Sequence, residues 1–458
     1  MNSHGNETYL KAAKVNLSKQ DVEALRIRLR PPGTIVFPKR GGAIATNKKR
    51  ILAQRSAYDL NTMGIYAIGL DHSYFWHWFM TIDLGNLSDG SNVPQINNDD
   101  IQPLNVPLPP RNEQRRIVEK IEELFTKLDA GVRSLEQARA LLKSYRRSVL
   151  KAAVEGELSR EWREAHRDTL EPTSELLERI LQERREKFAG KKYKEPDAPD
   201  TLKLPTLPNG WEWATTNQLF GFVTSGSRDW KKYYSNKGAI FIRTQDINKD
   251  RILLEDVSYV DLPPRAEGKR SRVLENDILI IITGANVGKV ALVDRPLPEA
   301  YVSQSVALTR PVVGEVAEFL HLAMIAEGFG RSQLDKLAYG MGRPVLNLTN
   351  VQQLILPLPS LAEQEIITSE YQRRISIIDE LDDAVEASLR RADGLRQSIL
   401  KRAFSGKLVP QDPDDESASM LLERIRLERE AAKPKPRKGR KSNARPTKSG
   451  HTDQGGLF

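Results

Sequence analysis

The sequence PLPPRNEQRRI at residues 107–117 returns as PLPSLAEQEII at residues 357–367, 250 positions further along the chain. A second pair of blocks, SVLKAAVEGEL (148–158) and SILKRAFSGKL (398–408), has the same separation. The segments between the blocks therefore have the same length in both halves, which indicates a rigid element in each. The second half of the chain reads as a repeat of the first.

The rigid element is predicted to be a long helix. Between the blocks, apolar residues follow alternating steps of three and four, the spacing of helices that pack along a shared seam. A helix of about 40 residues would be about 60 Å long, too long to stand alone, so we expect the two helices to pack on each other. A glycine near each C-terminal end, Gly156 or Gly406, fits a helix cap. The predicted seams are Ile117, Ile121, Leu124, Leu128, Leu135, Ala138, Leu142, Tyr145 and Val149 in the first half, and Ile367, Tyr371, Ile378, Leu381, Val385, Ala392, Leu395 and Ile399 in the second.

Residues 211–356 are predicted to form an α+β domain. Short β-rich runs (AIFIR, DILIIIT, KVALVD and SVALT) accompany one apolar helical stretch at 318–337. The region before residue 107 is shorter, about 106 residues against about 150, and has no counterpart of LPNGWEWATTNQLFGFVTSGS at 207–227. We therefore expect the first domain to lack its N-terminal part. Shorter helices are expected at 172–188 and 416–430, and a linker at 189–210.

The composition excludes several classes of protein. The 458 residues carry a formal net charge of +9 and include no cysteine, so disulfides, thiolate zinc sites and cysteine nucleophiles are excluded, and a reducing cytoplasm is the expected location. No apolar run approaches the roughly 18 residues of a membrane helix, and the first residues lack the order of a signal peptide. Eight lysines and arginines without an acid occupy 433–448, a tail that we expect to be disordered.

The sequence offers no catalytic motif. GANVGK (284–289) is one residue short of a phosphate-binding loop, has Val290 where serine or threonine is needed, and is predicted to be a turn between strands. The three Pro-Pro pairs lack the Asn-Pro-Pro-aromatic sequence of amino-methyltransferases, and the six histidines are too scattered for a metal site. We expect no catalytic residue and no metal, which favours a binding protein over an enzyme.

Basic and polar residues cluster in loops of both predicted domains. Arginine and lysine contact phosphates, and polar or planar side chains can contact base edges. Any single one of them is more often an ordinary surface residue, so the prediction rests on the clusters as a group. The candidate DNA-binding residues are Lys39, Arg40, Lys48, Lys49 and Arg50 in the first domain, and Ser225, Ser227, Arg228, Lys231, Lys232, Tyr233, Lys269, Arg270, Arg272 and Arg343 in the second.

These features together resemble one family. The duplicated PLPxxxEQ block at the start of a heptad helix, the closing S[VI]LKxAxxGxL block and the LPNGWEW opening of a domain are similar to the specificity subunits of type I restriction-modification systems. The resemblance covers about residues 9–430. It implies an α+β fold with two target-recognition domains, joined and separated by two long antiparallel coiled-coil spacer helices in a pseudo-two-fold internal repeat. Each domain would read half of a split DNA sequence, and helix length would set the gap.

The resemblance also implies partners. Two modification subunits would bind S-adenosylmethionine and methylate adenine in double-stranded DNA, and restriction subunits would cleave with ATP and Mg, while this chain would hold no cofactor. In the family, modification subunits dock on the spacer helices and the conserved blocks. The matching positions here are candidates for that interface, with capping and orientation of the helix start as an equal alternative: Pro107, Glu113, Gln114, Pro357, Glu363 and Gln364.

The expected domain organisation follows the repeat. It consists of a first target-recognition domain (1–106), a first spacer helix (107–156), a short helix and linker (157–204), a second target-recognition domain (205–356), a second spacer helix (357–406), a short helix (407–432) and a basic disordered tail (433–458).

Two alternatives stay open. The short first domain is also what a truncated or inactive specificity subunit would have, because a missing strand leaves an exposed sheet edge. A coiled-coil scaffold that joins proteins without reading DNA would carry similar helices and basic loops. Salt-sensitive DNA binding with a sequence preference would distinguish a DNA-reading specificity subunit from a scaffold that does not read DNA.

Overall fold

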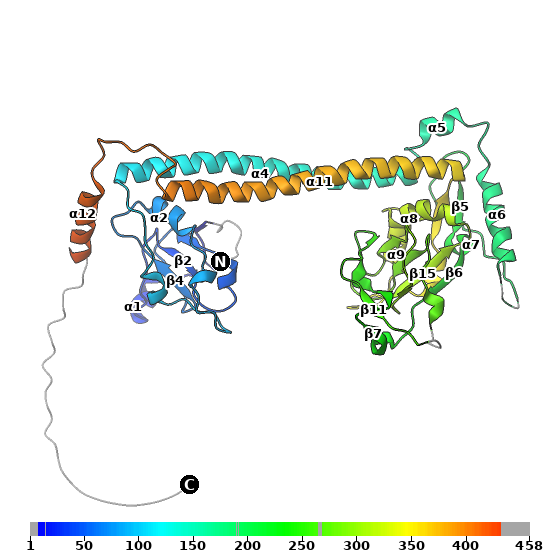
Figure 1. Ribbon diagram of the computed structural model, residues 1–458, viewed down its shortest axis with the longest axis horizontal. Helices are drawn as coiled ribbons and strands as arrows, with labels where there is room; N and C mark the ends of the chain where they lie inside the picture. Colours follow the sequence, from blue (N-terminus) through cyan, green and yellow to red (C-terminus); the bar gives the residue numbers. More distant parts are fainter. Residues whose placement is uncertain (1–7, 14, 189, 191, 264–267, 432–458) are drawn as a thin grey trace, which may run out of the picture. The chain divides into compact units, whose positions relative to one another are not determined.

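The repeated blocks lie on two long helices. In the computed structural model, which describes residues 8–13, 15–188, 190, 192–263 and 268–431, these are α4 (Arg111–Val154) and α11 (Leu361–Phe404), each of 44 residues (Figure 1). Pro110 and Pro359 lie just before the two helices, where the missing N–H of proline costs no helical hydrogen bond. The prediction of one long helix in each half is confirmed. The predicted basic tail at 433–458 lies outside the described residues.

The chain divides into a first unit, residues 1–133 with 389–458, and a second unit, residues 134–388. Both long helices cross the division, so each unit contains one part of α4 and one part of α11.

The first unit contains a four-stranded sheet in the order β1-β3-β2-β4. Strand β1 runs parallel to β3, and the other pairs are antiparallel. The sheet shares its core with α2, where the rings of Phe37 and Phe79 lie 5.1 Å apart. The elements are β1 (Tyr9–Leu10), α1 (Lys19–Ala24), β2 (Ile35–Pro38), η1 (Ile44–Thr46), β3 (Arg50–Leu52), β4 (Thr62–Ile65), α2 (His72–Phe79), η2 (Gly85–Leu87), α3 (Asn98–Ile101) and α12 (Ala418–Ala431).

Within the first unit, the start of α4 lies beside the end of α11 (Figure 1). Asp129, which lies later on α4 than Ile117, forms an ion pair with Arg396, which lies earlier on α11 than Leu400. Later residues of α4 therefore contact earlier residues of α11, so the two segments are antiparallel. The shared apolar cluster includes Ile117, Ile121, Leu400 and Ala403.

The second unit is built on two four-stranded sheets, β13-β12-β15-β6 and β14-β8-β11-β7, with two-stranded pairs β16-β5 and β10-β9. The four predicted β-rich runs form β8, β12, β13 and β15. The elements are α5 (Arg160–Ala165), α6 (Thr173–Glu186), β5 (Glu212–Thr215), α7 (Thr216–Leu219), β6 (Phe220–Ser225), η3 (Trp230–Tyr233), β7 (Tyr234–Ser235), β8 (Ala239–Ile242), η4 (Thr244–Asp246), β9 (Ile247–Asn248), β10 (Arg251–Ile252), β11 (Ser258–Val260), η5 (Lys269–Ser271), β12 (Ile278–Ile281), β13 (Val290–Leu292), β14 (Ala300–Val302), β15 (Val306–Pro311), η6 (Gly314–Val316), α8 (Ala317–Ile325), α9 (Gly330–Leu337), α10 (Leu348–Gln352) and β16 (Ile355–Leu358).

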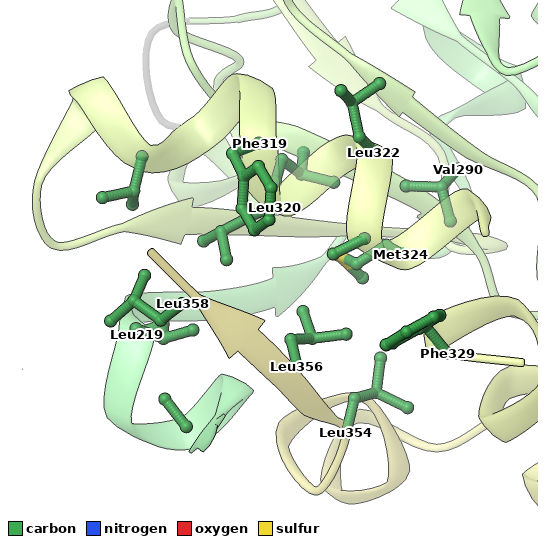
Figure 2. Packing of buried hydrophobic residues seen from close by; sticks show 14 of the residues in the cluster. Leu219, Val290, Phe319, Leu320, Leu322, Met324, Phe329, Leu354, Leu356 and Leu358 are labelled. Carbon is green, nitrogen blue, oxygen red and sulfur yellow. The ribbon is translucent and has the colours of Figure 1, made fainter. Parts of the chain in front are cut away.

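The core of the second unit explains its most apolar sequence run. Ile278 and Ile280 of β12 belong to one buried cluster, and Leu279 and Ile281 belong to another. A strand buried on both faces needs no polar alternation. Figure 2 shows the first cluster, in which side chains of α8 pack against Leu356 and Leu358 of β16 and against neighbouring apolar groups.

The apolar stretch at 318–337 was predicted as one helix and forms two, α8 and α9. The break brings the backbone of Gly330 so close to α8 that an added Cβ would lie 2.5 Å from the Cα of Met324. A single helix over this stretch could not make that contact. The break falls at Gly328, whose φ is +84°, and Gly330, and the prediction of a single helix passed over these two glycines.

The helix seam was predicted only in part. In the second unit, Val149 shares a buried cluster with Ile375 and Ile378, and Arg146 and Arg139 pair with Asp379 and Asp382, again in antiparallel order. Ile375 was not in the predicted seam and is buried. Three predicted seam residues are about half exposed: Tyr145 and Leu381 at 49% and Leu395 at 55%.

Candidate nucleic-acid interface

Loops from distant parts of the sequence meet at one edge of the β13-β12-β15-β6 sheet. The antiparallel registers pair Ser225 with Ala307 and Ile281 with Val306. Strands β6 and β12 therefore end, and β15 begins, at the same edge. We call this edge of the second unit, with the loops that follow β6 and β12, the basic edge.

The loop after β6 is held by a buried aromatic residue. Trp230 is 4% exposed, and its ring lies 5.6 Å from Phe241 and 5.3 Å from Tyr301. Lys231 and Lys232 follow it in η3 and are exposed. The buried Trp230 ring fixes the loop, while the ammonium groups of Lys231 and Lys232 remain accessible to a ligand.

The second predicted cluster, residues 268–272, lies against the first. An added Cβ on Gly268 would fall 1.9 Å from the Oγ of Ser227, so the two loops touch at a position that only glycine fits. Arg270 donates from Nε to Oγ1 of Thr224 at 3.0 Å and is otherwise exposed. The structure thus brings together two clusters that lie about 40 residues apart in sequence. Arg228 and Arg272 are exposed in these loops, Ser225, Ser227 and Tyr233 are half-buried, and the side chain of Lys269 lies outside the described part.

The third cluster reaches the same edge through a hairpin. Tyr339 and Val345 exchange backbone hydrogen bonds of 3.0 and 2.8 Å. The hairpin is tied to the end of β12, because Leu346 donates its N–H to the carbonyl of Ile282 at 2.9 Å. Arg343 is exposed at the hairpin turn.

Sequence reasoning missed two apolar groups beside Arg343. Met341 is fully exposed and Tyr339 is 56% exposed. Exposed apolar side chains at the tip of a basic hairpin can pack on sugars or bases, which charged residues do less well. The two glycines that flank Met341 in YGMGR signalled a turn, and they could have drawn attention to its side chain.

An ion pair at the end of the strands opposite the basic edge holds the 268–272 loop from below. Arg310 of β15 donates to both carboxylate oxygens of Asp277, at 2.6 and 2.7 Å, and Nη2 also donates to the carbonyl of Arg272 at 3.2 Å. Asp277 is fully buried, and this burial raises its pKa although Arg310 lowers it. The pair joins the 268–272 loop to the sheet.

The predicted residues of the first unit lie where β2 ends and β3 begins, since Val36 pairs with Arg50. Arg40 is exposed, and Lys39, Lys48 and Arg50 are half-buried. The N–H of Gly41 donates a hydrogen bond to the carbonyl of Pro94. In the second unit, the N–H of Gly284 donates in the same way to the carbonyl of Pro344.

Lys49 does not fit its predicted role. It is 2% exposed, and its Nζ donates to the carbonyl of Ile82 at 2.6 Å and to Oδ1 of Asn47 at 2.8 Å. Burial lowers its pKa to about 8. A lysine held in this way stabilises its own loop and is not available to a phosphate.

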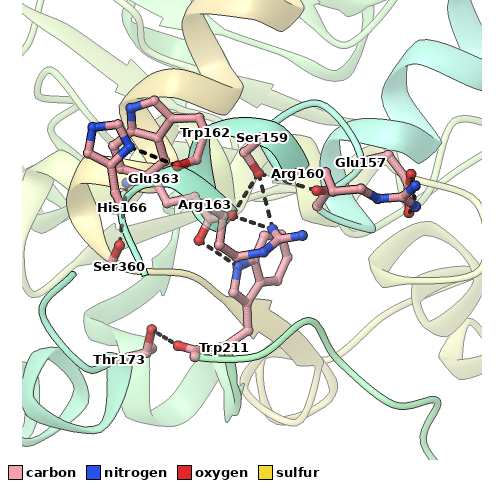
Figure 3. Close-up of polar contacts among 12 residues, drawn as sticks. Glu157, Ser159, Arg160, Trp162, Arg163, His166, Thr173, Trp211, Ser360 and Glu363 are labelled. Carbon is pink, nitrogen blue, oxygen red and sulfur yellow. Dashed lines mark hydrogen bonds and ion pairs between the residues drawn. The ribbon is translucent and has the colours of Figure 1, made fainter. Parts of the chain in front are cut away.

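The residues at the helix starts are mostly buried in the chain's own packing. Glu363 accepts hydrogen bonds from Ser159 Oγ at 2.6 Å, Arg163 Nη1 at 2.5 Å and Trp211 Nε1 at 2.9 Å (Figure 3). Gln364 donates to the carbonyl of Pro359 at 2.8 Å. These contacts join the start of α11 to α5 and to the segment that leads into β5.

The first copy repeats one of these contacts. Gln114 donates to the carbonyl of Pro109 at 2.9 Å, and its Oε1 accepts from the N–H of Asp71 at 3.0 Å. Pro107 is exposed, and its carbonyl accepts from the hydroxyl of Tyr74. Glu113, Gln114, Pro357, Glu363 and Gln364 are buried, which favours the helix-start role over direct contact with a partner.

The described residues offer no helix that is long and apolar enough to cross a membrane. Within the same part of the chain, no group of three or more histidine or acidic side chains is placed to hold a metal ion.

Known proteins are similar to this chain in sequence and in fold. The family model of the type I restriction modification DNA specificity domain matches residues 31–137 and 208–387, more than half of the chain. The EcoBI specificity subunit of Escherichia coli is 29% identical over 357 residues, covering 74% of this chain and 68% of the relative. The EcoDI specificity subunit, also from Escherichia coli, is 25% identical over 383 residues, with 80% and 79% covered.

One solved structure has the same fold, with a TM-score of 0.59 at 16% identity over 83% of both chains, and is described as the structural basis of complex assembly and conformational transition of the type I R-M system. With the family model matched over both of its segments, the chain belongs to the family of type I restriction-modification specificity subunits.

Proposed function

We propose that the chain recognises a bipartite DNA sequence, with one half-site read by the sheet domain of each unit. The two separate segments that match the family model support two recognition domains. The observation that carries the proposal is the basic edge, where exposed cations lie on loops that buried residues hold in place: Arg228, Lys231, Lys232, Arg270, Arg272 and Arg343.

The basic edge has both kinds of group that DNA reading requires. Exposed lysine and arginine side chains contact phosphates and supply affinity, which falls as salt rises. Half-buried polar groups such as Ser225 and Ser227, and the exposed hairpin side chains, lie at the same edge, and in this proposal they contact bases. In the first unit, Lys39, Arg40, Lys48 and Arg50 form the corresponding surface.

The two long helices act, in this proposal, as coiled-coil spacers between target-recognition domains at 1–106 and 205–356. Their antiparallel packing within each unit supports this role. The helix-start contacts of Gln114 and Gln364, which recur 250 residues apart, support a pseudo-two-fold repeat.

The chain supplies no catalytic group and no cofactor in this proposal. Two modification subunits methylate adenine with S-adenosylmethionine, and restriction subunits cleave with ATP and Mg, in the cytoplasm where the DNA lies. The printed names of the relatives support a place in such a complex.

Charge reversal tests the basic edge. Changing Arg228, Lys231 and Lys232 to glutamate should weaken DNA binding strongly and reduce the slope of log affinity against log salt by about 2.7, at about 0.9 per lost phosphate contact. The matched control is Lys192, Lys194 and Lys203 to glutamate, which makes the same change in net charge on exposed linker residues. Equal binding by the two variants would remove the basic edge from the interface.

Adenine methylation across a genome tests the whole proposal. Cells that supply cognate modification subunits are compared with and without this chain. A split motif that appears only with the chain supports specific recognition by both units, and a motif lost in the triple variant assigns the basic edge to one half-site. Absence of any chain-dependent motif would favour an inactive subunit or a scaffold.

A further inference from the structure

The hairpin of the second unit holds an apolar side chain out in solvent. Met341 is fully exposed, and among the described residues no other large apolar side chain has so high an exposed fraction. Exposure alone says little, because single apolar residues are common on protein surfaces. The backbone and the charges around Met341 are what make its exposure informative.

The turn that carries Met341 is narrow. Gly340 and Gly342, on either side of it, have φ values of +100° and +79°, a conformation that residues with a Cβ rarely adopt. An added Cβ on Gly342 would meet nothing within 4 Å of the described structure. The tip is therefore one unbranched apolar side chain on a thin turn, with no side chain on either neighbour.

The base of the hairpin is fixed to the sheet. Val345 forms an antiparallel bridge with Thr283, just beyond the end of β12. The N–H of Gly284 donates to the carbonyl of Pro344 at 3.0 Å, and Leu346 is 1% exposed. A tip on a fixed base can enter a ligand without the entropic cost of ordering a mobile loop.

The charges around the tip suit a polyanion. Residues 338–346 include Arg343 and no acidic residue. The exposed cations of the loop after β6 lie at the same edge, because only β15 separates β6 from β12. Two strand spacings of about 4.8 Å each lie within the span of a DNA major groove, about 12 Å wide. One stretch of duplex can therefore contact both loops.

The first unit has the same hairpin frame with a different tip. The N–H of Asp89 donates to the carbonyl of Gln95 at 3.2 Å, as the matching positions do in the second unit. Ser91 takes the position of Met341, and the carboxylate of Asp89 accepts from its N–H at 3.2 Å and from its hydroxyl at 2.9 Å. Val93 is exposed but takes the position of the arginine. The apolar tip thus belongs to the second unit.

We propose that Met341 is a wedge that enters the base stack at one step of the half-site read by the second unit, an inference that rests on the proposed function of the basic edge. An apolar side chain between two bases opens that step and kinks the duplex. Tyr339, 56% exposed at the base of the same turn, stacks on a base that the wedge uncovers. Arg343 binds a neighbouring phosphate.

The wedge makes Met341 a specificity-determining residue that forms no hydrogen bond to a base. The cost of opening a step depends on its sequence, and pyrimidine–purine steps open most easily. The second unit therefore selects a deformable step in its half-site. The first unit, with Ser91 at the same position, makes no such demand.

Fluorescent bases test the wedge in the complete complex. The full chain with its modification subunits is bound to duplexes in which 2-aminopurine replaces one adenine, or pyrrolo-cytosine one cytosine, of the second unit's half-site. Both probes brighten when they are unstacked, and together they reach every base pair. The adenine that is methylated is left out, because the modification subunits act on it. We expect one bright step with the parent and with Met341→Leu, and none with Met341→Ser.

Affinity separates the wedge from a phosphate contact. Met341→Ser should bind the cognate duplex about tenfold more weakly, because a buried apolar contact is lost. The slope of log affinity against log salt should not change, because no charge is lost. The matched control is Met420→Ser, the same change at an exposed position of α12, which should behave as the parent does in both measurements.

Failure of the wedge and failure of the proposed function give different results. A parent chain that directs no split motif and binds DNA without salt dependence would remove the DNA-reading role, and the wedge with it. A parent that reads its motif while every probed base stays dark would overturn the wedge alone, as would Met341→Ser with the parent's bright step. Loss of the modification subunits from the Met341→Ser complex would also overturn it, because Met341 would then contact protein.

Discussion

At the scale of the residue, the burial of His77 makes the free energy of unfolding of the first unit depend on pH. His77 is 8% exposed, with its ring 5.8 Å from that of Phe125, and burial lowers its pKa to about 4. An unfolded histidine titrates near 6.5, so between pH 6.5 and 4 the unfolded chain binds the proton that the folded chain does not. Stability from this residue is therefore complete above pH 6.5 and is lost as the pH falls toward 4.

The His77→Phe variant should lose that dependence. We expect the free energy of unfolding of the parent to fall about 3 kcal/mol further than that of the variant between pH 7 and pH 4. Urea unfolding at each pH, monitored by hydrogen exchange of the backbone amides of α2, measures this difference in the free energy of unfolding. A parallel loss in parent and variant would show that His77 is not the titrating group.

At the scale of the element, the start of α11 depends on a cluster of polar side chains that was not predicted from the sequence. Arg163, 14% exposed in its side chain, pairs with Glu363 and lies 5.9 Å from the ring of Trp211. Removing one partner of a buried ion pair leaves an uncompensated charge. The contact holds α5, the segment before β5 and the start of α11 together.

Arg163→Met should therefore destabilise the second unit by about 3 kcal/mol. The matched control is Arg160→Met, because Arg160 forms an exposed pair with Glu157 and should cost less than about 1 kcal/mol. Urea unfolding followed by tryptophan fluorescence, to which six tryptophans including Trp211 contribute, measures the loss. Similar losses in both variants would mean that the Glu363 cluster contributes no special stability.

At the scale of the whole molecule, the proposed spacer role makes a prediction about DNA. Inserting four residues in each long helix, after Arg133 and after Ser388, adds about 6 Å of helix, between one and two base-pair steps at about 3.4 Å each. The methylated half-sites should stay the same while the gap between them grows. An unchanged gap with retained methylation would contradict the spacer role.

The sequence by itself determined the large features of this protein. The repeated blocks fixed two helices of equal length, because equal spacing between matched ends tolerates only a rigid element. The run DILIIIT predicted a strand, since a continuous apolar run of so short a length suits a strand, and the structure shows that this strand is buried on both faces. The likeness to specificity subunits was also present in the blocks themselves.

Only the tertiary structure decided which side chains are available. Lys49 is one of five clustered cations in sequence, and its burial depends on a carbonyl 33 residues away. The basic edge joins residues 224–235, 268–272 and 340–343, which pairing registers bring together and composition does not. The same holds for Glu113 and Glu363, identical in motif and different in surroundings. Local sequence sets propensity and pattern, whereas burial and partners come from contacts between segments far apart in the chain.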